Sequence, residues 1–350
     1  MKKMLILVMV LVLPVLIACD GNNQSTVNGD EGVANGSQIA DNGGAETMEP
    51  PDFSTTPMLS AGAGFSLALR ADGTVWHWGR TPGLGETNTP MQVENLTNIT
   101  AISAGVTHAM ALRYDGTVWT WHRMNDAHTT PTQLPDIVDV IAISAGFAGA
   151  SSQSLVLLSD GSLYVLRGEP MLIATDVVDM SVDSVLKSDG TVWRKSSPMQ
   201  WQHLNQIDGL ENIIAIEGAT ALCSDGTVWI WGDHPSLGVA ITQSDVTDII
   251  AVTGGPALRN DDTVWQVAGE PQQVENLSEV VALSFTRSTA GGLSAHSLAL
   301  REDGTVWAWG VNTEGQLGDG TTSGDDNTNR RDLPAQVLGE NGVGYFNLIE

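Results

Sequence analysis

A short hairpin that returns seven times constrains the fold of this chain more than any other feature. Its last copy, residues 297–310, reads as two strands on either side of Asp303-Gly304, the second with a Trp-Ala-Trp-Gly run. Asp and Gly tolerate the positive φ of a tight turn, and apolar residues alternate on both sides. The intervals between copies run from 29 to 45 residues, with turns at Asp72, Asp115, Asp160, Asp189, Asp225, Asp261 and Asp303.

Hairpins at this spacing predict an all-β protein, a seven-bladed β-propeller with four-stranded antiparallel blades. An isolated hairpin leaves its apolar face in water and is marginally stable. Sheets packed face to face in a ring cover one another, and a propeller blade needs about four strands. With two central turn residues, Leu298 and Leu300 would share a sheet face with Trp307 and Trp309, whereas a turn one residue longer would change this parity.

The spacers between hairpins supply the other two strands of each blade. Strands rich in small residues precede the hairpins at 99–105, 140–146, 213–218 and 280–284, and we expect them at the crowded inner edge. Strands led by proline follow at 90–93, 131–134, 271–274 and 334–337. Proline lacks a backbone donor, which favours outer-edge positions for these strands.

The two ends of the repeat region predict how the ring closes. Residues 342–350 end where another small-residue strand would begin, and residues 58–62 supply such a strand. We therefore expect closure by pairing of the N- and C-terminal segments within one blade, which would remove an exposed sheet edge.

The ordered motifs resemble the regulator-of-chromosome-condensation repeat over roughly residues 58–350, most completely in 295–337. They are Ile-Ser-Ala-Gly, His-Ser-Leu-Ala-Leu-Arg-x-Asp-Gly-Thr-Val-Trp-Ala-Trp-Gly, Gly-Gln-Leu-Gly-Asp-Gly-Thr-Thr and Pro-x-Gln-Val. Tyr164, Arg194-Lys195 and Asp262 depart from the pattern and obscure three blade boundaries. The resemblance implies a propeller and, by the family's name alone, guanine-nucleotide exchange.

The N-terminal region predicts export and a lipid anchor. Residues 1–19 have Lys2 and Lys3, then an apolar run too short to span a bilayer, and end in Leu-Ile-Ala-Cys. This ending resembles the lipobox of bacterial lipoprotein signal peptides, in which Cys19 is acylated; an ordinary cleaved signal is the alternative. Residues 20–57 form an acidic tether rich in Gly and Asn that we expect to be disordered. Residues 58–350 are the propeller, placed outside the cytoplasm and lipid-anchored to the bacterial cell membrane.

Net charge and cysteine content limit the partners. The formal charge of −26 leaves no basic footprint for nucleic acid, so we expect no chromatin contact. With Cys19 acylated, Cys223 has no disulfide partner.

Catalytic motifs for zinc proteases, serine hydrolases and phosphate-binding loops are missing from the sequence. The recurring aspartates suit turns, and the paired tryptophans suit packing between blades better than sugar stacking. His108 and His296 share a repeat position; they could converge as ligands near the channel, but a hydrogen bond to backbone within their own blade is favoured. We therefore expect no enzyme activity, no cofactor and no metal.

Residues 311–332 form the most distinctive surface segment, a loop in which residues 323–331 insert acids, Asn, Gly and Arg into the Gly-Asp-Gly-Thr-Thr run. Long loops on a rigid scaffold are where binding concentrates, whereas the spacing of a calcium loop is absent. Companion loops at 80–89, 123–130 and 233–244 should lie on the same side of the ring. The predicted partner-binding residues are Asn312, Glu314, Gln316, Asp319, Asp325, Asp326, Arg330 and Arg331.

The sequence thus favours a non-catalytic, membrane-anchored extracytoplasmic scaffold for protein–protein interaction, monomeric and bound to an envelope or extracellular protein. Three alternatives stay open. One is a secreted enzyme inhibitor resembling the propeller β-lactamase inhibitory proteins, although the longest loop here is polar rather than aromatic. The others are guanine-nucleotide exchange, which export opposes, and a propeller lyase, for which no convergent acid, base and cation are visible.

Overall fold

The computed structural model describes residues 53–122, 130–146, 153–167, 169–197, 200–234, 238–286, 295–322 and 330–349. The predicted signal peptide with Cys19, almost all of the predicted tether, and Asp325 and Asp326 lie outside these residues. The chain divides into two compact units, and every strand described below belongs to the one that contains residues 54–350. Within the described residues, no helix is long and apolar enough to cross a bilayer.

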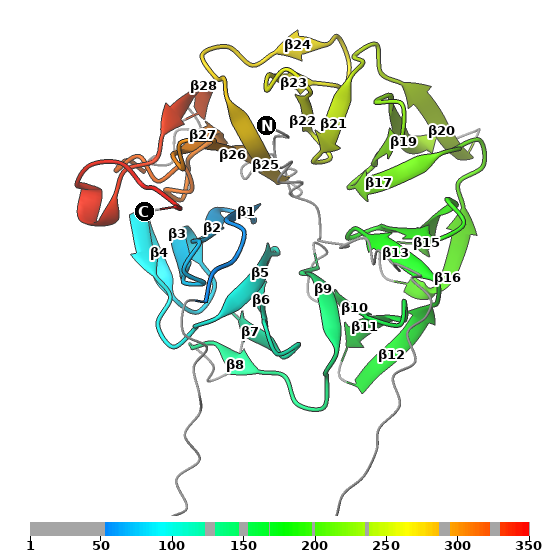
Figure 1. The fold of residues 1–350 in the computed structure, drawn as a ribbon, viewed down its shortest axis with the longest axis horizontal. Coiled ribbons are helices and arrows are strands. Elements are labelled where there is room, and N and C mark those ends of the chain that lie inside the picture. Colours follow the sequence, from blue (N-terminus) through cyan, green and yellow to red (C-terminus); the bar gives the residue numbers. More distant parts are fainter. Residues whose placement is uncertain are drawn as a thin grey trace, which may run out of the picture. The chain divides into compact units, whose positions relative to one another are not determined.

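The described strands form seven four-stranded antiparallel sheets, the blades of a β-propeller, as predicted (Figure 1). Each blade uses four strands that are consecutive in the chain. Blades one to three comprise β1 (Met58–Ala61), β2 (Phe65–Leu69), β3 (Val75–Thr81), β4 (Gly85–Gln92); β5 (Ile99–Ala104), β6 (His108–Arg113), β7 (Val118–His122), β8 (Thr132–Gln133); and β9 (Val140–Ser144), β10 (Ser154–Leu158), β11 (Leu163–Arg167), β12 (Glu169–Ala174). Blades four and five comprise β13 (Val177–Met180), β14 (Ser184–Lys187), β15 (Val192–Ser197), β16 (Gln200–Gln206); and β17 (Ile213–Glu217), β18 (Thr220–Cys223), β19 (Val228–His234), β20 (Gly238–Gln243). Blades six and seven comprise β21 (Ile249–Val252), β22 (Pro256–Arg259), β23 (Val264–Gln266), β24 (Gln272–Gln273); and β25 (Val280–Thr286), β26 (His296–Arg301), β27 (Val306–Val311), β28 (Arg330–Gln336).

The order of strands within a blade agrees with the composition of the spacers. The small-residue strands, such as β5 and β25, are innermost, and the strands associated with proline are outermost (Figure 1). Pro90 lies within β4 and Pro334 within β28, both at a sheet edge. An edge strand has one side without a ladder, so a missing backbone donor is tolerated there.

The hairpin turn is one residue longer than the two-residue alternative. In the last copy, the Arg301 N–H donates to the Thr305 carbonyl at 3.0 Å and the Gly304 N–H donates to the Arg301 carbonyl at 2.9 Å. Gly304 has φ of 82°, the left-handed conformation that closes a three-residue loop.

The longer turn changes the parity of the hairpin. Trp307 therefore lies opposite Ala299, and Trp309 lies opposite Ser297. Leu298 and Leu300 are on the other face of the sheet.

Tryptophans join neighbouring blades, as predicted. Trp78, Trp121, Trp231 and Trp309 are buried second members of the Trp pairs. Trp121 of the second blade packs in a cluster with Phe65 and Leu67 of the first. Trp309 of the seventh blade packs with Leu258 of the sixth. The apolar face of one blade is thus covered by the next one.

The two ends meet, but not within one blade as expected. The first blade already has its own small-residue strand, β1, so no strand is missing from it. Residues 337–349 instead run along the seam between the last and first blades, and η2 (Glu340–Gly342) lies beside β4 (Figure 1). The Phe346 ring packs edge-on against Trp76 and Trp78, with centroids 5.3 and 5.8 Å apart. The Leu348 carbonyl accepts the Ala71 N–H at 2.9 Å.

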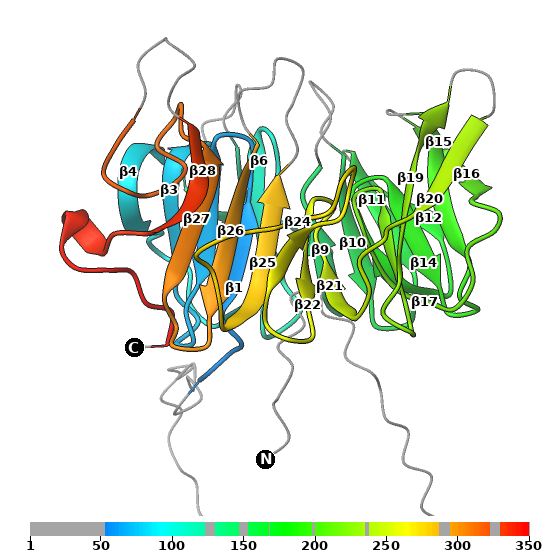
Figure 2. The ribbon, with the colours of Figure 1, turned by 90° about the horizontal axis from the view of Figure 1, so that it is seen from above.

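The strands run through the thickness of the ring and define two sides (Figure 2). We call the side with the Asp turns the turn side. The opposite side, where β3 joins β4 and β27 leads toward β28, is the loop side. The described parts of the companion loops 80–89 and 311–332 both lie on the loop side; residues 123–129 and 235–237 are outside the described residues.

Candidate functional site

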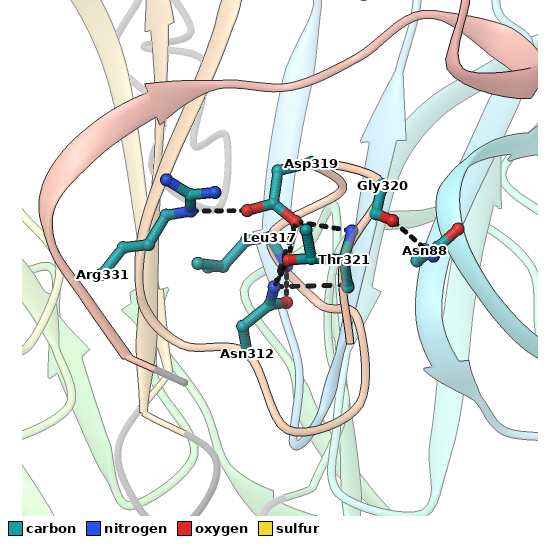
Figure 3. A network of polar contacts seen from close by, with 7 residues as sticks. All are labelled: Asn88, Asn312, Leu317, Asp319, Gly320, Thr321 and Arg331. Carbon is teal, nitrogen blue, oxygen red and sulfur yellow. Dashed lines mark hydrogen bonds and ion pairs between the residues drawn. The ribbon is translucent and has the colours of Figure 1, made fainter. Parts of the chain in front are cut away.

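The predicted partner-binding loop begins with two buried amides. Asn312 and Gln316 are both fully buried. The Asn312 Nδ2 donates to Asp319 Oδ1 at 3.1 Å and to Thr321 Oγ1 at 2.9 Å, and its Oδ1 accepts the Leu317 N–H at 3.0 Å (Figure 3). The Gln316 Oε1 accepts the Glu314 N–H at 2.8 Å. These two side chains therefore shape the loop and present no surface to a partner.

Asp319 is the centre of the loop's polar network. Its Oδ1 accepts the N–H and hydroxyl of Thr321 at 3.0 and 2.6 Å, and its Oδ2 accepts Arg331 Nε at 2.5 Å (Figure 3). Burial alone would raise the pKa of this carboxyl, but the Thr321 hydrogen bonds and the Arg331 guanidinium outweigh it and hold the pKa below its usual value. Asp319 is thus an anion fixed in place.

The loop is also attached to the first blade. Asn88 Nδ2 donates to the Gly320 carbonyl at 2.8 Å, and the Gly320 N–H donates to the Asn88 carbonyl at 3.0 Å. Trp78 Nε1 donates to the Gln316 carbonyl at 2.9 Å. Arg80 and Glu314 form an ion pair at 3.4 Å. Residues 312–321, which we call the clasp, therefore fasten the last blade to the first.

The accessible members of the predicted set are Glu314, Arg330 and Arg331. The side chain of Arg330 is 64% exposed and pairs with Asp332 at 3.0 Å. Arg331 is less exposed because it reaches back to Asp319. The structure brings Asn312, Asp319 and Arg331 together, whereas Asp325 and Asp326 lie outside the described residues.

The repeated turn aspartates have structural partners, as the sequence predicted. Asp303 Oδ1 accepts the N–H and hydroxyl of Thr305 at 3.0 and 2.6 Å. The Trp307 Nε1 donates to the same hydroxyl at 3.2 Å, and Arg301 lies over the Trp307 ring at 5.8 Å. In the fifth copy, hydrogen bonds from Thr227 lower the pKa of Asp225. Each carboxylate thus stabilises its own turn.

His108 and His296 are neither channel ligands nor bonded only within their own blade. His296 Nε2 is 2.8 Å from Ser66 Oγ in the first blade, and His108 Nε2 is 2.5 Å from Ser154 Oγ in the third. Both histidines are buried. They connect one blade to the next, which the sequence of a single repeat does not reveal.

Serines of the inner strands form a second set of links between blades. Ser60 Oγ accepts the Ala104 N–H, Ser103 Oγ accepts the Ala145 N–H and Ser284 Oγ accepts the Ala61 N–H, each at 2.9 Å. Ser181 Oγ accepts the Gly218 N–H at 2.8 Å. The recurring Ser of the Ile-Ser-Ala-Gly motif was the sequence signal for this ring, and its role was missed.

Three carboxyl groups, those of Asp179, Asp183 and Glu217, gather where blade four joins blade five, and sequence reasoning missed these too. Asp179 is buried, and its two oxygens accept the Met180 and Ile216 N–H groups at 2.8 and 2.9 Å. Burial raises the pKa of Asp179 to about 8, with Glu217 as a further cause. Burial also raises the pKa of Glu217 to about 7, with Asp183 adding to it. Asp183 itself pairs with Lys195.

This junction borders a cavity of about 180 Å³ in the centre of the ring. The inner strands line it with small residues and hydroxyl groups, and Asp183 and Glu217 are its ionisable lining residues. In the described residues, no group of three His, Cys, Asp or Glu is arranged to hold a metal ion. Cys223, the described cysteine, is a buried free thiol.

Comparisons with known proteins agree with this architecture. The family model described as "Regulator of chromosome condensation (RCC1) repeat" matches residues 303–347, and a second model of the same description matches residues 59–81, 99–121 and 288–316. No curated protein matches the chain.

Two solved structures show how far the likeness extends. The chain is similar to Prp20p from Saccharomyces cerevisiae, whose crystal structure was described with its binding properties to Gsp1p and histones. The two are 16% identical with a TM-score of 0.60, over 76% of this chain and 86% of that one. Human WBSCR16 is 17% identical with a TM-score of 0.44, over 83% of this chain and 82% of that one. At 16% identity, the likeness to Prp20p concerns the fold alone.

Proposed function

We propose that this chain, whose propeller carries regulator-of-chromosome-condensation repeats, is a non-catalytic scaffold that binds another protein through the loop side of its ring. The observation that carries the proposal is the clasp. Its buried amides and the fixed Asp319 carboxylate hold the β27–β28 connection rigid up to Thr321. A rigid base lowers the entropy lost when a loop binds a partner.

The accessible groups around the clasp suit protein recognition. Arg330 and Leu333 of β28 are exposed, an arginine and an apolar side chain on one outer strand. Arginine contributes strongly to interfaces because its guanidinium combines hydrogen bonds with apolar contact.

Matched charge and apolar changes on the two sides of the ring test the proposal. The double variant Arg330→Glu/Leu333→Asp alters the loop side. Val138→Asp/Lys187→Glu makes the same charge changes on the turn side, near the start of β9 and the end of β14. In cross-linking and mass spectrometry on intact cells, we expect only the loop-side variant to lose its specific protein partner. Equal recovery by both variants, or no specific partner for the unchanged chain, would contradict the proposal.

We also propose that the scaffold is lipid-anchored outside the cytoplasm through Cys19. The charged start, the short apolar run and the Leu-Ile-Ala-Cys ending support this. Cys19→Ser should abolish metabolic labelling with palmitate and move the protein from the membrane pellet to the soluble fraction. A labelled Cys19→Ser variant would refute the assignment of the acylated residue.

A further inference from the structure

One position on the inner strands breaks the pattern of the repeats. Six blades have a hydroxyl residue there, and the fifth has Glu217; the six are Ser60, Ser103, Ser144, Ser181, Thr253 and Ser284. Two residues after Ser181, Asp183 occupies the position of glycine in the Ile-Ser-Ala-Gly copies. Burying a carboxyl where a hydroxyl would suffice costs free energy. Such departures from an otherwise consistent pattern are typical of functional positions.

The Glu217 carboxyl is only partly satisfied by the protein. Its Oε1 accepts the Ser181 hydroxyl at 3.2 Å and the Gly218 N–H at 3.1 Å. Its Oε2 accepts no hydrogen bond from the described residues. Because Glu217 lines the central cavity, a ligand there can supply the missing donor.

The charges around the carboxyl do not balance. Negative charge on Glu217 helps to raise the pKa of Asp179, and negative charge on Asp183 helps to raise the pKa of Glu217. The basic side chain here is Lys195, which pairs with Asp183 and donates to the Val182 carbonyl at 3.1 Å. Lys195 balances Asp183, and Asp179 with a pKa of about 8 keeps its proton near neutral pH. Glu217 is therefore the carboxyl whose charge a proton or a further cation must neutralise.

The neighbouring acceptors suit a primary ammonium. The Thr253 hydroxyl lines the cavity and donates its own proton to the Pro256 carbonyl at 2.6 Å, so its oxygen is left to accept. Glu217 Oε2 and the Asp183 carboxylate are the other acceptors. An ammonium has three donors, which can point to three separate acceptors. A guanidinium prefers to bind both oxygens of one carboxylate, whereas Glu217 has only Oε2 available because Oε1 already accepts two hydrogen bonds.

We propose that the central cavity binds a primary ammonium group at Glu217, supplied either by a small amine or by a lysine side chain. This site does not depend on the loop-side interaction proposed above. Binding favours the ionised form of Glu217, whose pKa near 7 makes both forms accessible around neutral pH. Affinity should therefore rise with pH. From the ionised fraction of a group with that pKa, we expect about a tenfold increase between pH 6 and pH 8.

The test is titration calorimetry of the full chain in detergent solution at pH 6 and pH 8. The probes are n-butylamine and Nα-acetyl-lysine methylamide, with n-butanol as the neutral counterpart of the first. We expect an amine to bind, n-butanol not to bind, and Glu217→Ser and Glu217→Gln each to weaken amine binding at least tenfold. Glu217→Ser restores the hydroxyl of the other blades, and Glu217→Gln keeps the side-chain shape, so thermal unfolding should show both variants folded.

The outcomes separate the sources and the alternatives. Binding of n-butylamine alone assigns the site to small amines, and binding of both amines shows that a lysine side chain fits. No binding of either amine at pH 8, equal binding of n-butanol, or unchanged amine binding by a folded Glu217 variant would overturn the proposal. In that case protons alone neutralise the junction.

Discussion

Removing the Phe346 ring should weaken the ring of blades at its closing seam. Phe346 is 4% exposed and contacts Trp76 and Trp78 of the first blade in a cluster with Leu298 and Val306 of the seventh. Replacing a buried phenylalanine by alanine costs about 3–5 kcal/mol, because apolar contact is lost and a cavity remains. We expect Phe346→Ala to lower the free energy of unfolding by about 4 kcal/mol.

The neighbouring residue provides a matched control. Tyr345 is an aromatic residue of similar size but is 63% exposed, so Tyr345→Ala should change stability by less than about 0.5 kcal/mol. Phe346→Leu should fall between the two, at about 1–1.5 kcal/mol, because it keeps apolar contact and loses the edge-on ring pairs. Urea unfolding followed by tryptophan fluorescence measures all three, and the contact partners of Phe346 are themselves tryptophans. Equal costs for the alanine variants at 345 and 346 would refute our account of the seam.

Three further predictions concern the clasp, the links between blades and the buried carboxyl groups. Asn312→Ala should lower the free energy of unfolding by about 2–4 kcal/mol, because the buried Leu317 N–H and the Thr321 hydroxyl lose a partner, whereas Arg330→Ala should stay within about 0.5 kcal/mol in the same urea assay. His108→Phe and Ser154→Ala should each destabilise the protein, and the double variant should recover at least about 1 kcal/mol of their summed cost. The double variant has the same residue pair, Phe and Ala, that Phe65 and Ala109 form between the first two blades. Additive costs in a double-mutant cycle would contradict the hydrogen bond between His108 and Ser154 as a link between blades. Because burial raises the pKa of Asp179 from 3.8 to about 8, the folded state holds a proton that the unfolded chain releases, and stability should fall as pH rises from about 4 to 8. Asp179→Asn should reduce this slope in urea titrations at several pH values, and an unchanged slope would show that another group is responsible.

The fold could be predicted because its main determinants are local and repeated. Asp225 and its equivalents satisfy their own turns, and the Trp residues after them need a neighbouring sheet to cover them. Seven such units at short spacing leave few arrangements other than a closed ring. Which residues share a face of the hairpin was harder to predict, because this depends on one left-handed residue, Gly304, that lengthens the loop by one position.

The candidate site was harder to predict because its contacts are not local. Asn312 and Gln316 are polar residues in a loop and looked accessible in the sequence, yet they are buried in a network attached to the first blade. The serine partner of His296 is 230 residues away in the chain. Glu217 could have been found from sequence by aligning the inner strands with one another, since it stands where the other copies have Ser or Thr.

The two backbone hydrogen bonds of Ala71 indicate that this chain can be circularly permuted. The carbonyl of Ala71 accepts the Thr55 N–H at 2.8 Å and its N–H donates to Leu348, so backbone from both extremities of the repeat region lies at one residue. Each sheet is assembled from one uninterrupted stretch of sequence, and none borrows a strand from another. A short peptide could therefore link the vicinity of residue 348 to that of residue 55, while new termini are opened in any connection between sheets. The ring therefore does not depend on which of the seven blades comes first in the sequence. In circular permutants, each blade should keep the same neighbours around the ring.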